Sequence, residues 1–123
     1  MSVRRLRLGA RGEAAVAQWY EAAGYRILAR NWRCREGEID LVASRGPTLA
    51  VCEVKTRTTS AYGLPAEAVT VAKQRRLRRL AARWLAESAG ENRGRFHAEL
   101  RFDVACVSVV PTGLSVEVIE AAF

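Results

Sequence analysis

Two apolar runs joined by a short turn decide the fold of this chain: IDLVAS (residues 39–44) and LAVCEVK (residues 49–55), separated by Arg45-Gly46-Pro47. Their composition predicts two neighbouring strands of one sheet. Three charged side chains interrupt these runs: Asp40, Glu53 and Lys55. Because strand side chains alternate between faces, Glu53 and Lys55 should project from one side, about 7 Å apart. Pairing of the strands should bring Asp40 alongside.

This set of charges suits a divalent metal ion. Mg²⁺ binds one or two carboxylates, keeps several waters and bridges to phosphate oxygens, so Asp40 and Glu53 are the expected ligands of Mg²⁺ or Mn²⁺. The Lys55 ammonium would offset the repulsion between them, orient or help deprotonate a metal-bound water, and stabilise charge on an attacked phosphate. The alternative is an ordinary hairpin with charges on a solvated face. Because the charges interrupt apolar runs and come as a set, we favour a metal-dependent nuclease site.

A helix from about Leu6 to Gly24 is expected to direct a third carboxylate toward these strands. Glu13 lies on its apolar face, close to Val16, Ala17 and Tyr20 on a helical wheel. A buried carboxylate needs a cation or hydrogen-bond donors, so Glu13 is a candidate metal contact, directly or through water. The alternative is a glutamate that complements the helix dipole.

A second helix, from about Ala66 to Ser88, is expected to carry Lys73 at the centre of its apolar stripe. Lys73 should therefore face inward and contact nucleic acid, although a packed stem with its ammonium in water is the alternative. Gln74, at the margin of the stripe, is positioned to hydrogen-bond a water or phosphate. Pro65 suits the first turn. The other arginines are interpreted as a solvated basic side of this helix: Arg75, Arg78, Arg79 and Arg83.

The polar loop 56–65 leaves directly from Lys55. Its residues Arg57, Thr58 and Tyr62 are expected to contact phosphates or to stack on a base. A loop without a binding role is the alternative.

Two further segments complete the expected sheet. Residues 25–32 alternate as a strand with Tyr25, Ile27 and Ala29 on one face. Residues 96–110 and 114–119 predict a hairpin around Pro111-Thr112-Gly113. Asp103 interrupts this hairpin, and we favour a structural pair with an arginine over a place in the acidic site.

Composition places the chain among single-domain nucleic-acid-binding proteins. Its 123 residues fit one domain, 1–123, and its net charge of +7 predicts attraction to a polyanion. Lys55 and Lys73 are the only lysines, and both fall at inward positions. Three scattered cysteines, and the lack of a signal-like or membrane-spanning apolar run, predict a cytoplasmic protein without a membrane partner. A single histidine, His97, excludes a two-histidine metal motif.

Several short motifs follow one another along most of the chain. They are Gly12-Glu13-Ala14-Ala15, Asn31-Trp32-Arg33, Gly37 to Leu41, Val51 to Arg57, Gly63-Leu64-Pro65, Lys73-Gln74 and Arg101 to Val104. In this order they resemble the PD-(D/E)xK nuclease superfamily, especially its small Holliday-junction-resolvase-like members, and most closely the YraN family of small bacterial proteins. One departure is that Asp40 stands in Glu-Ile-Asp rather than after a proline.

The resemblance implies an α/β, restriction-endonuclease-like fold: a mixed β-sheet flanked by helices, in the order α-β-β-β-α-β-β. It also implies metal ligation by Asp40 and Glu53, an assisting Lys55, and accessory roles for Glu13 and Gln74.

We therefore expect a Mg²⁺- or Mn²⁺-dependent DNA endonuclease, with branched or recombining DNA as candidate substrates and RNA as a further one. One alternative is a catalytically inactive nucleic-acid-binding or adaptor protein, in which the same charged residues form a buried structural ion network. Another is a partner-binding subunit with no nucleic-acid contact. A junction resolvase needs two active sites, so a homodimer is a further expectation.

Overall fold

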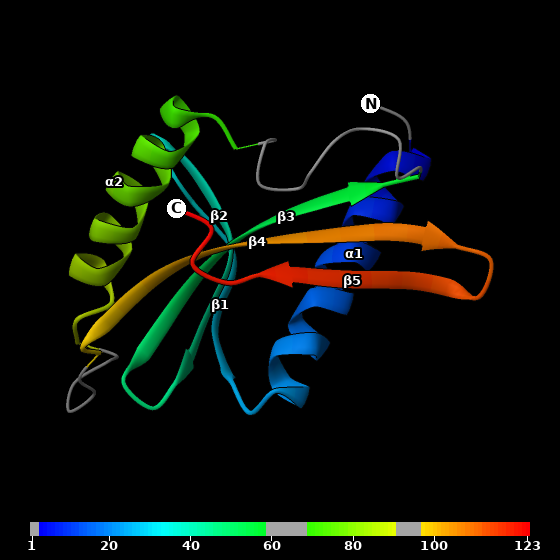
Figure 1. The fold of residues 1–123 in the computed structure, drawn as a ribbon. Coiled ribbons are helices and arrows are strands. Elements are labelled where there is room, and N and C mark those ends of the chain that lie inside the picture. The colour runs from blue at the N-terminus through cyan, green and yellow to red at the C-terminus, as the bar shows by residue number, and fades with distance from the viewer. Residues whose placement is uncertain (1–2, 59–68, 91–96) are drawn as a thin grey trace.

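The computed structural model describes residues 3–58, 69–90 and 97–123, and it has the expected order of elements. These are α1 (Val3–Ala22), β1 (Arg26–Cys34), β2 (Gly37–Arg45), β3 (Thr48–Arg57), α2 (Val71–Glu87), β4 (Glu99–Val110) and β5 (Gly113–Ile119) (Figure 1). The strands form one sheet in the order β1-β2-β3-β4-β5. Strands β3 and β4 are parallel, and the other neighbours are antiparallel. The α/β fold with a mixed sheet is therefore confirmed.

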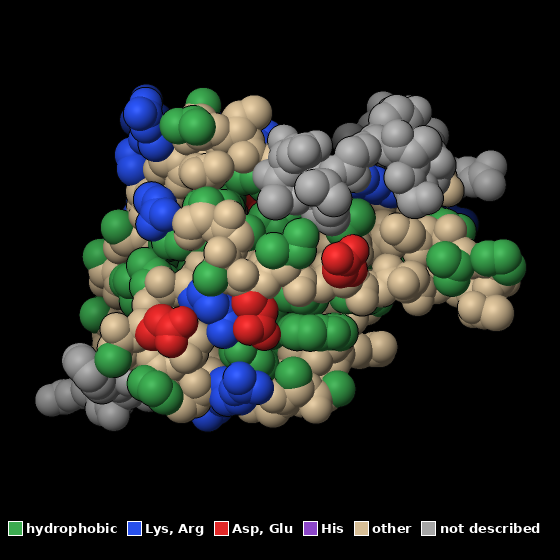
Figure 2. All heavy atoms as spheres, viewed as in Figure 1, with side chains coloured by type: hydrophobic (Ala, Val, Ile, Leu, Met, Phe, Trp, Pro, Cys, Tyr) green, Lys and Arg blue, Asp and Glu red, His purple; other side chains and the backbone are tan. Residues whose placement is uncertain are grey.

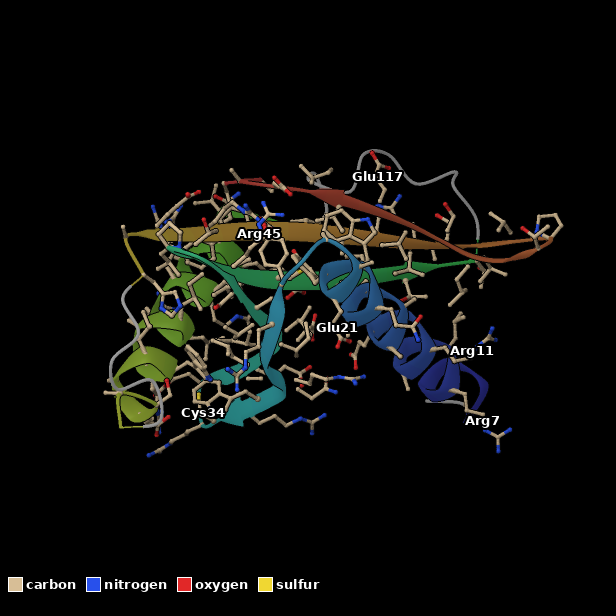
Figure 3. All side chains as sticks on the ribbon, turned by 90° about the horizontal axis from the view of Figure 1, so that it is seen from below. Arg7, Arg11, Glu21, Cys34, Arg45 and Glu117 are labelled. Carbon is tan, nitrogen blue, oxygen red and sulfur yellow. The ribbon has the colours of Figure 1, made fainter. Side chains whose placement is uncertain are left out.

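The single parallel pair explains the position of α2. Parallel strands need a long crossover, usually a helix, which packs on one face of the sheet. Helix α2 lies in the crossover from β3 to β4. Seen from below, β1 and β2 lie between the two helices (Figure 3). No helix among the described residues combines the length and apolar content that a membrane span needs.

Strand β3 divides the core between the two helices. Ala50 and Cys52 belong to the cluster around α1, whereas Leu49 and Val51 belong to the cluster around α2. This alternation follows from the two-residue period of a strand. It places Glu53 and Lys55, which continue the Leu49–Val51 series, on the α2 face.

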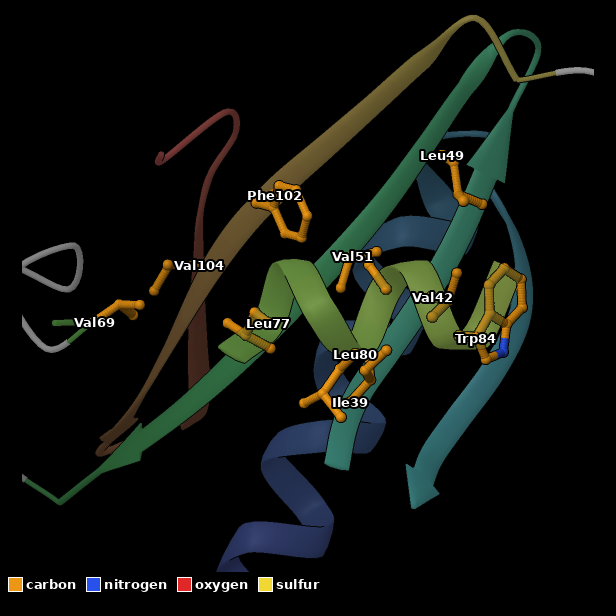
Figure 4. Packing of buried hydrophobic residues seen from close by; sticks show 11 residues of the cluster. Ile39, Val42, Leu49, Val51, Val69, Leu77, Leu80, Trp84, Phe102 and Val104 are labelled. Atoms are coloured by element: carbon orange, nitrogen blue, oxygen red, sulfur yellow. The ribbon is translucent and has the colours of Figure 1, made fainter. Parts of the chain in front are cut away.

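The α2 cluster fixes the helix against β2, β3 and β4 (Figure 4). Leu77, Leu80 and Trp84 are almost fully buried, in one cluster with Ile39 and Phe102. Each such side chain contributes about 1.5–3 kcal/mol through burial. This packing holds the first turns of α2, with Lys73, beside the sheet.

Helix α2 begins later than the sequence pattern predicted. It starts at Val71, and the Thr70 side chain accepts a hydrogen bond from the Lys73 amide at 3.2 Å, which is an N-cap. Val69 is buried but precedes the helix. The predicted start at Ala66 and the predicted role of Pro65 lie outside the described residues.

Strand β1 corrects a second prediction. The register with β2 shifts between Ile27 and Ala29, which is a β-bulge at Leu28. Ile27 consequently packs toward the α1 cluster and Ala29 toward the α2 cluster. The prediction that Tyr25, Ile27 and Ala29 share one face is therefore wrong for Ala29.

Asp103 forms a structural pair with an arginine, as we expected from the sequence. Its fully buried carboxylate accepts hydrogen bonds from Arg101 Nε at 2.8 Å, Arg101 Nη2 at 2.9 Å, Tyr20 Oη at 2.6 Å and the Ala121 amide at 3.1 Å. A buried carboxylate is tolerated when it is paired and hydrogen-bonded in this way. The network ties α1, β4 and the C-terminal segment together, on the face opposite to α2.

Candidate metal and nucleic-acid site

The site begins where β2 and β3 stop pairing. Their ladder ends at Leu41 and Cys52, while β3 stays paired with β4 as far as Arg57. Beyond the ladder, the Val54 amide donates to Asp40 Oδ2 at 2.8 Å. The Asp40 carboxylate therefore replaces a backbone partner at the point where the strands diverge.

Strand alternation is also interrupted at Asp40. Ile39 packs in the α2 cluster and Leu41 in the α1 cluster, although regular alternation would put both side chains on one face. Asp40 lies between them, half-buried. This local irregularity places its carboxylate at the edge between the two sides of the sheet.

Glu53 and Lys55 project from the same face, as predicted. Lys55 Nζ lies 3.3 Å from Glu53 Oε1, and both side chains are largely shielded from solvent. Lys73 on α2 lies within hydrogen-bonding reach of Lys55. The prediction that Lys73 faces inward is thus confirmed, and the two lysines of the chain meet beside Glu53.

A cleft of about 250 Å³ opens between the sheet and α2. The sheet contributes the carboxylates of Glu38, Asp40 and Glu53, and α2 contributes Lys73 and Arg76. Gly37, Leu77 and Leu80 complete the lining. The cleft therefore has an acidic wall and a basic wall that face each other.

Asp40 is the carboxylate most perturbed by this arrangement. Burial raises the pKa of Asp40 to about 7, although the hydrogen bond from Val54 lowers it. The negative charges of Glu53, Glu13 and Glu38 contribute to the same rise. No ion pair joins Asp40 to a basic side chain in the described parts of the chain. A half-buried carboxylate among other carboxylates is the environment that a bound cation would relieve.

The pKa values of Lys55 and Lys73 are shifted by each other as well as by the nearby carboxylates. Desolvation lowers the pKa of Lys55, but the hydrogen bond with Lys73 and the charges of Glu53 and Asp40 outweigh it, so the pKa of Lys55 is raised. The hydrogen bond with Lys55 and its positive charge lower the pKa of Lys73. Of the two amines, Lys55 is therefore the one that loses its proton at the higher pH.

Glu13 approaches the site from α1 because that helix packs closely on β3. A Cβ atom at Gly12 would collide with the Thr56 side chain, so a glycine permits this approach. Glu13 is near enough for its charge to act on Asp40. In the described parts of the chain, however, no group of three or more His, Cys, Asp or Glu side chains is close enough to hold a metal ion. Direct ligation by Glu13 stays a prediction.

The remaining predicted contacts lie at the rim or beyond it. Gln74 Nε2 donates to the Val69 carbonyl at 3.1 Å, so this amide holds the segment before α2. Arg57 ends β3, and Thr58 follows it, exposed. Tyr62 lies outside the described residues. The roles proposed for Gln74, Arg57, Thr58 and Tyr62 stay predictions.

The arginines of α2 differ more than the sequence pattern suggested. Arg78 stacks over Phe102, with its Cζ 4.7 Å from the ring centroid, and Arg83 donates to Glu36 at 2.8 Å. Arg78 is exposed and Arg83 is partly exposed, as a solvated side predicts, but both also make structural contacts that the sequence pattern did not indicate. Arg76, which the sequence reading did not single out, lines the cleft. Its spacing three residues after Lys73 was the available signal, because such residues are neighbours on a helix surface.

A mixed sheet with a helix on each face and carboxylates on its diverging central strands defines an α/β protein of the restriction-endonuclease-like class, as the resemblance implied. The model of the uncharacterised protein family UPF0102 matches residues 12–107. The chain belongs to this family, which is the YraN family, so the resemblance is confirmed.

Similar proteins come from several bacteria. A UPF0102 protein of Beutenbergia cavernae is 53% identical over 100 residues, covering 81% of this chain and 80% of that protein. A UPF0102 protein of Frankia casuarinae is 52% identical over 119 residues, covering 94% and 95%. One of Symbiobacterium thermophilum is 50% identical over 118 residues, covering 95% and 96%. Membership of the family does not by itself identify a reaction.

Proposed function

We propose that this protein is a divalent-metal-dependent nuclease that hydrolyses phosphodiester bonds in DNA. The observation that carries the proposal is the state of Asp40: a half-buried carboxylate with a raised pKa, one amide donor, and no cationic partner among the described residues. It lines a cleft with Glu53. Because no basic side chain of the described residues forms an ion pair with Asp40, a bound metal ion would supply the counter-charge that this carboxylate lacks.

The donor chemistry fits Mg²⁺ or Mn²⁺. Both prefer carboxylate oxygens, and Mg²⁺ sites commonly use one or two protein carboxylates together with waters. Asp40 and Glu53 would hold the ion. When bound, it would supply Lewis-acid polarisation of the phosphodiester and lower the pKa of a bound water.

Lys55 would act through its charge. Its raised pKa keeps it protonated, so it would stabilise negative charge that builds on the attacked phosphate instead of accepting a proton. Its ion pair with Glu53 holds the ammonium beside the proposed metal ligands. This refines the earlier expectation that Lys55 helps to deprotonate water.

Basic side chains on both helices would attract the nucleic-acid backbone. On one face of the molecule, Lys and Arg side chains stand over α2 (Figure 2). On the other flank, Arg7 and Arg11 extend outward from α1 (Figure 3). Because backbone contacts dominate nucleic-acid affinity, these flanks support a polyanionic substrate.

Cleavage assays with labelled DNA test the proposal. Duplex, single-stranded, flap and four-way-junction DNA are incubated with Mg²⁺, Mn²⁺ or EDTA. Cleavage should require metal and disappear in Asp40→Asn and Glu53→Gln. Glu117→Gln, an exposed change on β5, is the matched control and should cut like wild type. Equal cleavage by wild type and Asp40→Asn would reject the proposal.

A second function is favoured by one observation, the ion pair of Glu53 with Lys55. In a non-catalytic nucleic-acid-binding or adaptor protein, this pair and its neighbours would serve the fold alone. Such a protein would bind DNA without cutting it. Neutralising Asp40 or Glu53 would then change its stability but would abolish no metal-dependent stabilisation.

A further inference from the structure

Arg76 differs from the arginines that structural contacts hold on the same helix. Arg78 covers two aromatic rings, and Arg83 pairs with Glu36 and Glu87. Arg76 lines the cleft between α2 and the sheet. Within the described residues, no carboxylate pairs with its guanidinium.

The stem of Arg76 is positioned by the turn into β2. Gly37 has φ +148° and lines the same cleft. A Cβ atom on Gly37 would lie 3.7 Å from Arg76 Cδ and 3.5 Å from Leu80 Cδ1. The Arg76 side chain therefore runs along the backbone at the start of β2, beside the acidic wall.

Lys73 adds a second cation to the same wall. Residues three apart on a helix are surface neighbours, about 5–6 Å between Cβ atoms. Lys73 and Arg76 both line the cleft, and Leu77 and Leu80 continue this face of α2 into the core. The burial of Leu77 and Leu80 thus fixes the direction in which Lys73 and Arg76 point.

The chemistry of this basic wall suits a phosphodiester. A guanidinium presents a planar fork of donors that matches two oxygens of one phosphate, while an ammonium acts as a point charge. The opposite wall carries Asp40 and Glu53, the proposed metal ligands. A strand lying in the cleft would meet Arg76 and Lys73 on one side and, when metal is bound, the ion held by Asp40 and Glu53 on the other.

We propose that Arg76 binds a backbone phosphate of the nucleic acid and that Arg76 and Lys73 together form the phosphate-binding wall opposite Asp40 and Glu53. The inference rests on the proposed function in that it uses the same cleft. It adds a binding residue, and it assigns α2 the task of holding the strand while the sheet carries the chemistry. The ligand class is a DNA strand recognised through its phosphates.

The test measures binding separately from cleavage. Fluorescence anisotropy follows a labelled DNA duplex and a labelled four-way junction, with Ca²⁺ replacing Mg²⁺, over a series of salt concentrations. Arg76→Gln is compared with Arg75→Gln, which removes the same charge one residue away on the exposed side of α2. Arg76→Lys keeps the charge but loses the fork, and circular dichroism checks that each variant is folded.

Arg76→Gln should raise Kd about tenfold and reduce the salt dependence by about one phosphate contact. Arg75→Gln should raise Kd less than about twofold, and Arg76→Lys should fall between. Equal weakening by Arg76→Gln and Arg75→Gln would overturn the inference, since only the general basic field would then act. Absence of DNA binding by the wild type would also overturn it.

Failure of the proposed function gives a different result. If wild-type protein binds DNA with the Arg76 dependence described but cuts no DNA in Mg²⁺ or Mn²⁺, the nuclease proposal fails and the phosphate site stands. If it cuts DNA with the Asp40 dependence described but Arg76→Gln binds like Arg75→Gln, the phosphate site fails and the nuclease proposal stands.

Discussion

Neutralising Asp40 should stabilise the metal-free protein at alkaline pH. Asp40 has a pKa of about 7 in the fold against an ordinary value of 3.8. Between these values the folded state binds more protons than the unfolded state, so the contribution of Asp40 to stability is full below about pH 4 and is lost as pH rises through 7. At pH 8 the carboxylate is ionised in both states, and its burial opposes folding. Asp40→Asn removes this charge and keeps an oxygen that can accept the Val54 hydrogen bond.

The size of the effect follows from the pKa. A pKa that rises from 3.8 to about 7 corresponds to at most about 4 kcal/mol. Because Asp40 is only half-buried, solvent screening reduces this to about 2 kcal/mol. In a protein of this size, that gain raises Tm by about 8 °C. The same substitution should have almost no effect at pH 3, where Asp40 is protonated.

Thermal unfolding in EDTA at several pH values measures this difference, with Glu117→Gln as the control for loss of one exposed carboxylate. Mg²⁺ at about 100 times its Kd should then stabilise wild type by about 2.7 kcal/mol at pH 8 and leave Asp40→Asn unchanged. A drop in Tm of Asp40→Asn at pH 8 in EDTA would refute the reasoning. It would show that the Asp40 charge supports the fold, as the structural ion-network alternative requires.

Three other predictions concern the residues around the cleft. Lys55→Met should slow DNA cleavage by about a hundredfold at saturating metal, and single-turnover rates equal to wild type would contradict its charge-stabilising role. Asp103→Asn should lower the free energy of unfolding by about 3–5 kcal/mol, because Arg101 loses its buried partner; urea unfolding measures this, and a loss under about 1 kcal/mol would contradict it. Gly12→Ala should cost about 1–3 kcal/mol through its collision with Thr56. Gly9→Ala, with open space around it, should instead stabilise α1 by about 0.5–1 kcal/mol, and equal effects of the two alanines would exclude the close approach of α1 to β3.

Much of the fold was accessible from local sequence patterns. The apolar runs around Asp40 and Glu53 predicted neighbouring strands, and the two-residue period placed Glu53 and Lys55 on one face, where they form an ion pair. Asp103 lay inside an apolar strand, so its carboxylate had to find a donor. Arg101, two residues away on the same face of β4, is that donor.

Details that depend on tertiary packing could not be predicted from the sequence. Val69 and Lys73 are separated by one helical repeat, and this spacing does not distinguish a residue before the N-cap from one in the first turn. Thr70 was the relevant signal, since threonine is a preferred N-cap. The bulge at Leu28 leaves the composition of β1 unchanged, yet it moves Ala29 to the other face.

Predicting the cleft from the sequence would have required placing an exposed side chain, Arg76. Sequence periodicity identifies residues that are buried, and Arg76 is exposed although it lines the cleft. Its position follows from the close packing of Leu80 and Arg76 of α2 against Gly37, which no local pattern encodes. Similarly, the break in side-chain alternation at Asp40 can be predicted only when the paths of β2 and β3 are both known.

A crystal soaked in Mn²⁺ provides the most direct measurement of the central claim, that Asp40 and Glu53 form a divalent-metal site. Anomalous scattering should place manganese in the cleft, bonded to oxygens of both carboxylates, and the same soak of Asp40→Asn should lose the peak. A fully diffracting wild-type crystal with no manganese in the cleft, or with the ion bound only at other residues, would contradict the account.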